Sequence, residues 1–253
     1  MRIYSILALS FLAGELHAAT LPNTRPLILD GDLSVQMVAG IDRFLMSETT
    51  AAAKRRADFW KRDYRTAETH AASIQKNRAH FRTIIGAVDK RLPINALEFI
   101  HTTTTSSLRY EDEMMTVHAV RWPVLPGVHG EGLLIQPKGT LRARVIALPD
   151  ADQTPEQLAG IAPGIPVQAQ FARRLAAAGC QVVVPALINR SDTFSGDARV
   201  RFTNQTHREW IYRQAFQMGR HVIGYEVQKV LAVVDWFAAE NAKQPTAAPI
   251  AVA

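Results

Sequence analysis

Pro249-Ile-Ala-Val-Ala253 follows a long helical pattern that begins at Thr206. Thr206 and Glu209 have the spacing of a capping pair, in which each side chain satisfies a backbone N–H that the first helical turn leaves unpaired. Apolar residues then recur on one face at a 3.6-residue period, at Ile223, Val227, Val230, Leu231, Val234 and Phe237. The polar, proline-punctuated stretch 239–249 ends this helix. We therefore expect residues 249–253 to open a buried β-strand.

Two further runs predict strands that are buried on both faces. Val145-Ile-Ala-Leu148 and Val182-Val-Val184 are continuously apolar, which is typical of parallel strands covered by helices. Between them, Val167, Phe171 and Leu175 indicate a helix that Gly179 would close at its C′ position. This alternation of strand and helix predicts a parallel sheet with right-handed crossovers.

The preceding residues show a two-residue period that favours antiparallel strands. Leu97 to His101 and Met115 to Ala119 alternate, Thr102 to Thr105 are strand-prone, and Gly132 to Ile135 form a short run, whereas Trp122 to Gly127 indicate a loop. The predicted fold class is α/β, with antiparallel strands first and parallel strands with crossover helices after them. Residues 93–253 would form this domain.

Residues 20–92 are predicted to be helical. Leu33 to Tyr64 and Ala67 to Val88 each carry an apolar face, and the short connection between them favours an antiparallel helical pair. Residues 1–19 have the pattern of a secretory signal peptide: Arg2 precedes the apolar run Ile3 to Ala13, and Ala18 offers a small residue for cleavage.

The composition of the chain excludes several classes of protein. No other segment approaches about 20 apolar residues, so no membrane span is expected after signal removal, and the protein would be secreted or periplasmic. The single cysteine, Cys180, excludes an internal disulfide and is expected to be buried at a strand start. The formal charge is +6. Much of the excess lies between Lys54 and Arg65, where a solvated helix face is expected instead of a nucleic-acid partner.

Two loops would lie beyond the carboxyl ends of the buried strands, where open α/β sheets bind their ligands. The first, 149–155, carries Asp150, Ala151 and Asp152, and its backbone N–H groups are candidates for stabilising an oxyanion. The second, 185–205, carries Asn189 and Arg190, together with Asp192 and Arg199. Asp152, Asn189 and Arg190 are the candidate substrate-loop residues.

No cofactor or metal is expected. Asp150-x-Asp152 is a weak metal pattern without a suitably spaced His or Glu, and His70 and His80 lie too far apart for a common zinc motif. Gly127-x-x-Gly130-x-Gly132 precedes a strand instead of opening a helix, so it fails as a dinucleotide-binding loop.

Three stretches resemble the α/β-hydrolase fold, and in particular its exported acetyl xylan esterase and dienelactone-hydrolase-like branch. They are Val145-Ile-Ala-Leu-Pro149-Asp150, Gln181-Val-Val-Val-Pro185, and the helix from Met218 to Trp236 with Gly219 and Gly224. The resemblance covers roughly Leu97 to Ala253. It implies that residues 249–253 form the strand before the nucleophile elbow, and that a backbone N–H of Asp150 or Ala151 donates to the oxyanion.

In that family the nucleophile, the acid and the histidine follow this strand in order, so the resemblance implies that the triad is absent from this sequence. Ser191 and Ser195, with His207, His221, Asp192 and Asp197, are the local residues that would have to substitute. A serine nucleophile needs an oriented base within hydrogen-bond reach, and polar loop surface is expected instead.

The first hypothesis is the N-terminal part of an exported carboxylic-ester hydrolase acting on acylated carbohydrate, inactive in this form. The alternative is a non-catalytic exported binding or assembly module. Under either, the final strand would leave an apolar edge. The N-terminal helices, a partner chain or a C-terminal part would have to cover it.

Overall fold

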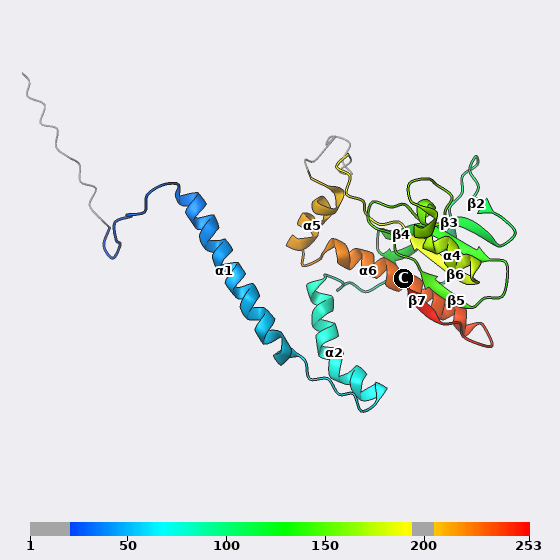
Figure 1. Cartoon of the computed structure of the whole chain (residues 1–253), viewed down its shortest axis with the longest axis horizontal. Helices are drawn as coiled ribbons and strands as arrows, with labels where there is room; N and C mark the ends of the chain where they lie inside the picture. Colours follow the sequence, from blue (N-terminus) through cyan, green and yellow to red (C-terminus); the bar gives the residue numbers. More distant parts are fainter. Residues whose placement is uncertain (1–20, 194–204) are drawn as a thin grey trace, which may run out of the picture. The chain divides into compact units, whose positions relative to one another are not determined.

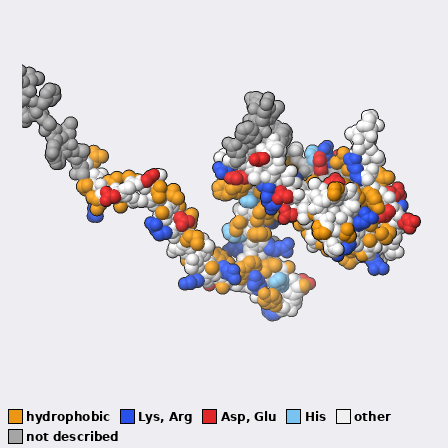
Figure 2. All heavy atoms as spheres, turned by 45° about the horizontal axis from the view of Figure 1, so that its top comes forward, with side chains coloured by type: hydrophobic (Ala, Val, Ile, Leu, Met, Phe, Trp, Pro, Cys, Tyr) orange, Lys and Arg blue, Asp and Glu red, His pale blue; other side chains and the backbone are white. Residues whose placement is uncertain are grey.

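The computed structural model describes residues 21–193 and 205–253 (Figure 1), so the predicted signal peptide lies outside the described residues. The chain divides into two compact units, Met1–Lys61 and Arg62–Ala253. In the first, Asp32 caps helix α1 (Leu33–Arg55) by accepting hydrogen bonds from the N–H groups of Ser34 and Val35. One 3₁₀ turn, η1 (Arg56–Phe59), follows, so the helix predicted to reach Tyr64 ends earlier. No residue of α1 is buried, and hydrophobic side chains lie open along it (Figure 2).

The second unit holds helix α2 and a sheet covered by helices. Its elements are α2 (Ala67–Ile84), β1 (Glu98–Phe99), β2 (Leu108–Glu111), β3 (Met115–Leu125), β4 (Val128–Pro137), β5 (Ala143–Ile146), α3 (Pro155–Leu158), η2 (Val167–Ala169), α4 (Phe171–Ala177), β6 (Cys180–Pro185), α5 (His207–Gln217), α6 (Val222–Ala242) and β7 (Ile250–Val252). The two N-terminal helices, α1 and α2, belong to different units, so the antiparallel pairing predicted between them stays a prediction.

The described strands form one mixed sheet in the order β1-β3-β4-β6-β5-β7, with β2 also paired to β3. The pairs β1–β3, β2–β3, β3–β4 and β4–β6 are antiparallel. Strand β5 pairs in parallel with both β6 and β7. This confirms the predicted α/β class, in which antiparallel strands precede parallel ones. The parallel strands β5 and β6 are apolar throughout their centres because helices cover both of their faces.

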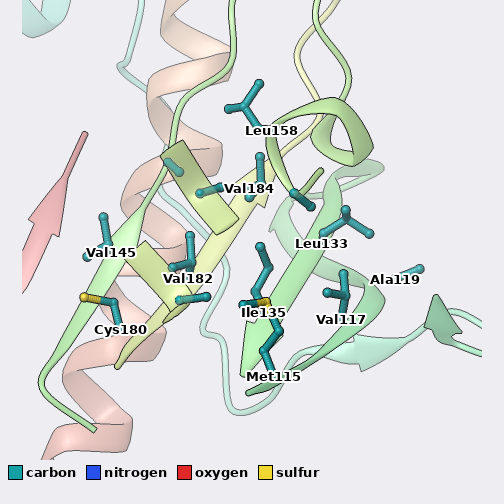
Figure 3. Close-up of a cluster of buried hydrophobic side chains, with 14 residues drawn as sticks. Met115, Val117, Ala119, Leu133, Ile135, Val145, Leu158, Cys180, Val182 and Val184 are labelled. Carbon is teal, nitrogen blue, oxygen red and sulfur yellow. The ribbon is translucent and has the colours of Figure 1, made fainter. Parts of the chain in front are cut away.

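Each face of the sheet carries its own core. Successive strand residues point to opposite faces, so Val182 and Val184 of β6 join Met115, Val117, Leu133 and Ile135 in one core (Figure 3), where α3 and α4 pack. Val183 points into the other core with Trp122, Ile146 and Phe237, under α6. Trp122 also donates its ring N–H to the backbone oxygen of Lys229 at 3.1 Å, which satisfies its polar atom against α6.

Two local predictions are wrong. The stretch 122–127, predicted to be a loop, belongs to strand β3 as far as Leu125, and a tight turn at Gly127 (φ +75°) joins it to β4. Thr102 to Thr105 form a turn instead of a strand. The hydroxyl of Thr102 accepts hydrogen bonds from the N–H groups of Thr104 and Thr105, and these compete with sheet pairing.

The long helix predicted from Thr206 is two helices. Thr206 caps α5, as predicted, by accepting from the N–H of Glu209 at 3.2 Å, but the carboxylate of Glu209 binds Arg213. The chain then turns at Gly219, whose φ of +66° no helix allows, and His221 caps α6 by accepting from the N–H of Ile223. The apolar period begins only at Ile223, beyond this break, so it did not bear on residues 206–222.

Residues 250–252 form strand β7, as predicted. Val145 of β5 lies opposite Ala251, and the pairing continues to Ala253, whose oxygen accepts from the N–H of Leu148 at 2.8 Å. The predicted burial is wrong, because Ala251, Val252 and Ala253 are exposed at the edge of the sheet. Within the described ranges, no helix is long and apolar enough to cross a membrane.

Candidate functional site

Two loops meet at the carboxyl ends of β5 and β6. Since these strands are parallel, both ends lie at the same edge of the sheet. The guanidinium of Arg190, from the loop after β6, donates to Asp150 at 2.8 Å and to Asp152 at 2.6 Å, both in the loop after β5. The backbone N–H of Arg190 also donates to Asp152 at 3.0 Å. Three of the candidate residues therefore lie together, although their role in binding or catalysis stays a prediction.

The three charges stabilise one another, although two carboxylates and one guanidinium keep a net charge of −1. Hydrogen bonds from Arg190 hold the pKa of both Asp150 and Asp152 below the usual range for a carboxyl, and the two carboxylates raise the pKa of Arg190. All three groups are therefore ionised at neutral pH. Arg190 joins the two loops and is not a free cation for a substrate.

Arg208 of α5 connects the loop after β6 to helix α6. Its guanidinium donates to Glu226 of α6 at 2.6 and 3.0 Å and to the backbone oxygen of Ile188 at 2.9 Å. Glu226 in turn accepts from the N–H of Ile188 at 3.3 Å. An open pocket of about 490 Å³ lies beside this pair, between α5 and the start of α6, with Tyr212 and His221 in its lining.

The two candidate oxyanion donors differ in their surroundings. The N–H of Asp150 donates to the side-chain oxygen of Gln153 at 3.2 Å, so it is engaged within its own loop. Ala151 is buried and lines a pocket between this loop and the sheet. Its backbone N–H also bonds to the carboxylate of Asp150 and helps to lower the pKa of that group, so both donors are engaged within the loop. Ala151 differs from Asp150 only in lining the pocket.

This second pocket has a volume of about 460 Å³. It brings the loop residues Asp152 and Asn189 beside strands β2, β3 and β4. Sequence reasoning missed Arg109 and Glu131 here, because only strand pairing brings these positions to the loops. It also missed Glu156, which lies in the first turn of α3, directly after the loop 149–155. The lining comprises Ile100, Arg109, Ala119, Glu131, Gly132, Leu133, Ala151, Asp152, Gln153, Thr154, Pro155, Glu156, Ala186, Leu187 and Asn189.

The described serine and histidine candidates are not arranged as a nucleophile and its base. The Ser191 hydroxyl lies 2.9 Å from that of Thr193, and Nδ1 of His207 lies 2.8 Å from Oδ1 of Asn189. His221 accepts from a backbone N–H as the cap of α6. Ser195 and Asp197 lie outside the described residues. In residues 21–193 and 205–253, no three His, Cys, Asp or Glu side chains are grouped to hold a metal ion.

No protein-family model matches this chain, and no curated protein matches it. A solved structure from Bacteroides fragilis NCTC 9343, described as a candidate acetyl xylan esterase, matches with a TM-score of 0.50 and 17% identity over 81% of this chain and 54% of its own. Acetyl xylan esterase 1 from Thermoanaerobacterium sp. JW/SL YS485 matches with a TM-score of 0.39 and 10% identity, over 71% and 49%. The chain spans about half the length of either protein. The first similarity shows the fold, and the chain has a hydrolase-like α/β architecture.

Proposed function

We propose that this chain is the N-terminal part of a carboxylic-ester hydrolase that acts on acylated carbohydrate. The observation that carries the proposal is the parallel pairing of β7 with β5. It sets the carboxyl end of β7 at the edge where the loops of Asp150 and Arg190 meet, and ligands of open α/β sheets bind at such an edge. A side chain on a turn after β7 would lie at this same edge of the sheet.

The proposed reaction is acyl transfer. A serine hydroxyl attacks the ester carbonyl, the alcohol part leaves with a proton from a histidine, and water then releases the acid from the acyl-enzyme. The backbone N–H of Ala151 supplies one donor to the oxyanion, which takes the place of the Asp150 carboxylate as its acceptor. The nucleophile, acid and base belong to the part of the hydrolase fold that this chain does not span, so residues 1–253 alone are inactive.

Two considerations support the substrate class and the location. The structural neighbour that matches over 81% of this chain is described as a candidate acetyl xylan esterase, which suggests an acetylated polysaccharide. The pattern of residues 1–19 suggests export to the periplasm or the medium. Sequencing the N-terminus of the protein recovered from outside the cytoplasm tests the second point, since export predicts a chain that starts near Ala19.

The decisive experiment compares residues 1–253 with the product of the complete reading frame that contains them. We expect the longer protein to hydrolyse 4-nitrophenyl acetate and to release acetate from acetylated xylan, and a serine-directed inhibitor to stop both reactions. The 253-residue chain should do neither. Inhibitor-sensitive turnover by residues 1–253, or a complete frame that encodes no esterase activity, would refute the proposal.

A non-catalytic exported binding module is the second candidate. It is favoured by the hydrogen bond from the N–H of Asp150 to Gln153, because that donor is then withheld from a reacting carbonyl. Replacing Gln153 by Ala in the complete protein separates the two. An enzyme should keep or gain turnover when this N–H is released, whereas a binding module has no turnover to change.

A further inference from the structure

We propose that the 460 Å³ pocket between the loop after β5 and strands β2–β4 binds a neutral sugar ring, the alcohol part of the ester and not its acyl group. This inference rests on the function proposed above and assigns one part of the substrate to one site. The volume lies within the range of about 300–1,000 Å³ typical of small-molecule sites, and a two-carbon acyl group would leave most of it empty.

The floor of the pocket is apolar. Ala119 of β3, Leu133 of β4 and Ala151 of the loop after β5 are buried, and Ile100 and Leu187 are partly buried beside them. An apolar surface of this kind can pack against the C–H face of a pyranose ring. Ala151 lies at this floor, so a ring seated there would hold its ester close to the candidate oxyanion donor.

The rim of the pocket carries polar side chains that suit hydroxyl groups. Arg109 offers several N–H donors in one plane, and Glu156 offers two acceptor oxygens. Asn189 offers its amide NH₂ group, since its oxygen already bonds to Ser191 and His207. Within the described residues, Arg109 and Glu156 form no ion pair and take part in no hydrogen bond through their side chains. Their donors and acceptors are thus available to a ligand that hydrogen-bonds along its whole edge.

The charge balance favours a neutral ligand. Glu131 is compensated by Arg121 at 2.6 Å, whereas Asp152 shares Arg190 with Asp150, so these three groups keep one negative charge beside the pocket. Arg109 and Glu156 remain and cancel each other. An acidic sugar would gain one contact with Arg109 but would place its charge among three carboxylates.

Calorimetric titration of the purified chain with xylotriose tests the proposal, because unacetylated sugar binds without any hydrolysis. We expect Arg109→Ala and Glu156→Ala each to weaken binding about fivefold, the effect of one lost hydrogen bond. Arg82→Ala and Glu113→Ala, at exposed positions outside the pocket, should bind as the parent does. A xylo-oligosaccharide that carries a glucuronic acid should bind no more tightly than xylotriose.

Circular dichroism first establishes that each variant is folded. A folded chain that fails to bind xylotriose, binding that neither pocket variant changes, or tighter binding of the acidic sugar would each overturn the proposal. The two proposals fail separately. Sugar binding without esterase activity in the complete protein would refute only the proposed hydrolase function. Esterase activity, together with unaltered sugar binding by the pocket variants, would refute only the proposed sugar pocket.

Discussion

Nε of Arg144 in strand β5 donates a hydrogen bond of 2.9 Å to Oδ1 of Asn241, which lies 97 residues later at the end of α6. The side chain of Arg144 is almost completely buried. The same Asn241 accepts from the N–H of Ala248 at 3.2 Å and donates to its oxygen at 2.7 Å. Asn241 therefore fastens the segment before β7 to a buried cation of the neighbouring strand.

Asn241→Ala should destabilise the sheet unit. The change removes a partner of a buried guanidinium and both bonds to Ala248, and hydrogen bonds to charged groups contribute about 1.5–3 kcal/mol. We expect the free energy of unfolding in urea to fall by about 2–3 kcal/mol. The matched control is Lys243→Ala, two residues on, whose exposed ion pair with Glu240 should be worth under about 1 kcal/mol. Equal effects from the two variants would show that Asn241 does not stabilise the segment before β7 through Arg144 and Ala248.

Gly224→Ala sets two opposing effects against each other. Alanine favours a helix by about 1 kcal/mol over glycine. A Cβ at this position, however, would lie 2.3 Å from the backbone oxygen of Ile85 and 2.6 Å from the carbonyl carbon of Gly86, and neither can rotate away. Overpacking costs about 1–3 kcal/mol, so we expect net destabilisation, seen as a lower thermal midpoint of the sheet unit.

Gly40→Ala is the control for this change. Gly40 lies inside α1, and a Cβ there has no neighbour within 4 Å. Only the helix-propensity term applies, so the helical signal at 222 nm should hold or rise. If Gly224→Ala behaves in the same way, the contact between α6 and residues 85–86 is not close in solution.

Hydrophobic patterning predicted the sheet of this chain better than its connections. The runs at Val145 and Val182 form strands because their residues are apolar on both faces, and such a run has few alternatives in a buried sheet. The break at Gly219 was missed because the predicted helix joined the cap at Thr206 to an apolar period that begins only at Ile223. The turn at Thr102 was missed because strand propensity ignores a hydroxyl that bonds to nearby N–H groups.

The two loops of the candidate site could also be predicted from the sequence, but the strand residues that line its pocket could not. Asp150 and Arg190 each follow a buried strand, so their shared edge follows from parallel pairing alone. Arg109 and Glu131 lie in antiparallel strands with no distinguishing neighbours in sequence. Only the pairing of β2 with β3 and of β3 with β4 brings them to the pocket.

The ion pair of Asp89 with Arg220 should make stability depend on pH. Arg220 donates to both carboxylate oxygens, at 2.6 and 3.1 Å, and these bonds hold the pKa of Asp89 below its usual value. A lowered pKa means that the pair stabilises the folded chain above the unfolded pKa of about 3.9, and that this contribution is lost as the pH falls through the folded value.

Asp89→Asn should therefore be less stable than the parent at pH 7, and the difference should shrink as the pH falls below about 4. Urea midpoints at pH 7, 5, 4 and 3 measure it. Glu113→Gln changes an exposed carboxyl that has no ion pair within the described residues, and it should follow the parent at every pH. A difference for Asp89→Asn that stays constant over this range would remove the ion pair as its cause.

Arg190→Ala should loosen the candidate site without unfolding the protein. The substitution removes the guanidinium that joins Asp150 and Asp152 to the loop after β6, and the pKa of both carboxyls should rise toward the usual value. Because all three side chains are more than half exposed, the urea midpoint should hardly change, whereas backbone amides of residues 150–154 should exchange faster with deuterium. Arg213→Ala, which breaks another exposed pair, should leave these amides unchanged. Unaltered exchange in Arg190→Ala would mean that the loop after β5 holds its shape by Gln153 and its own backbone.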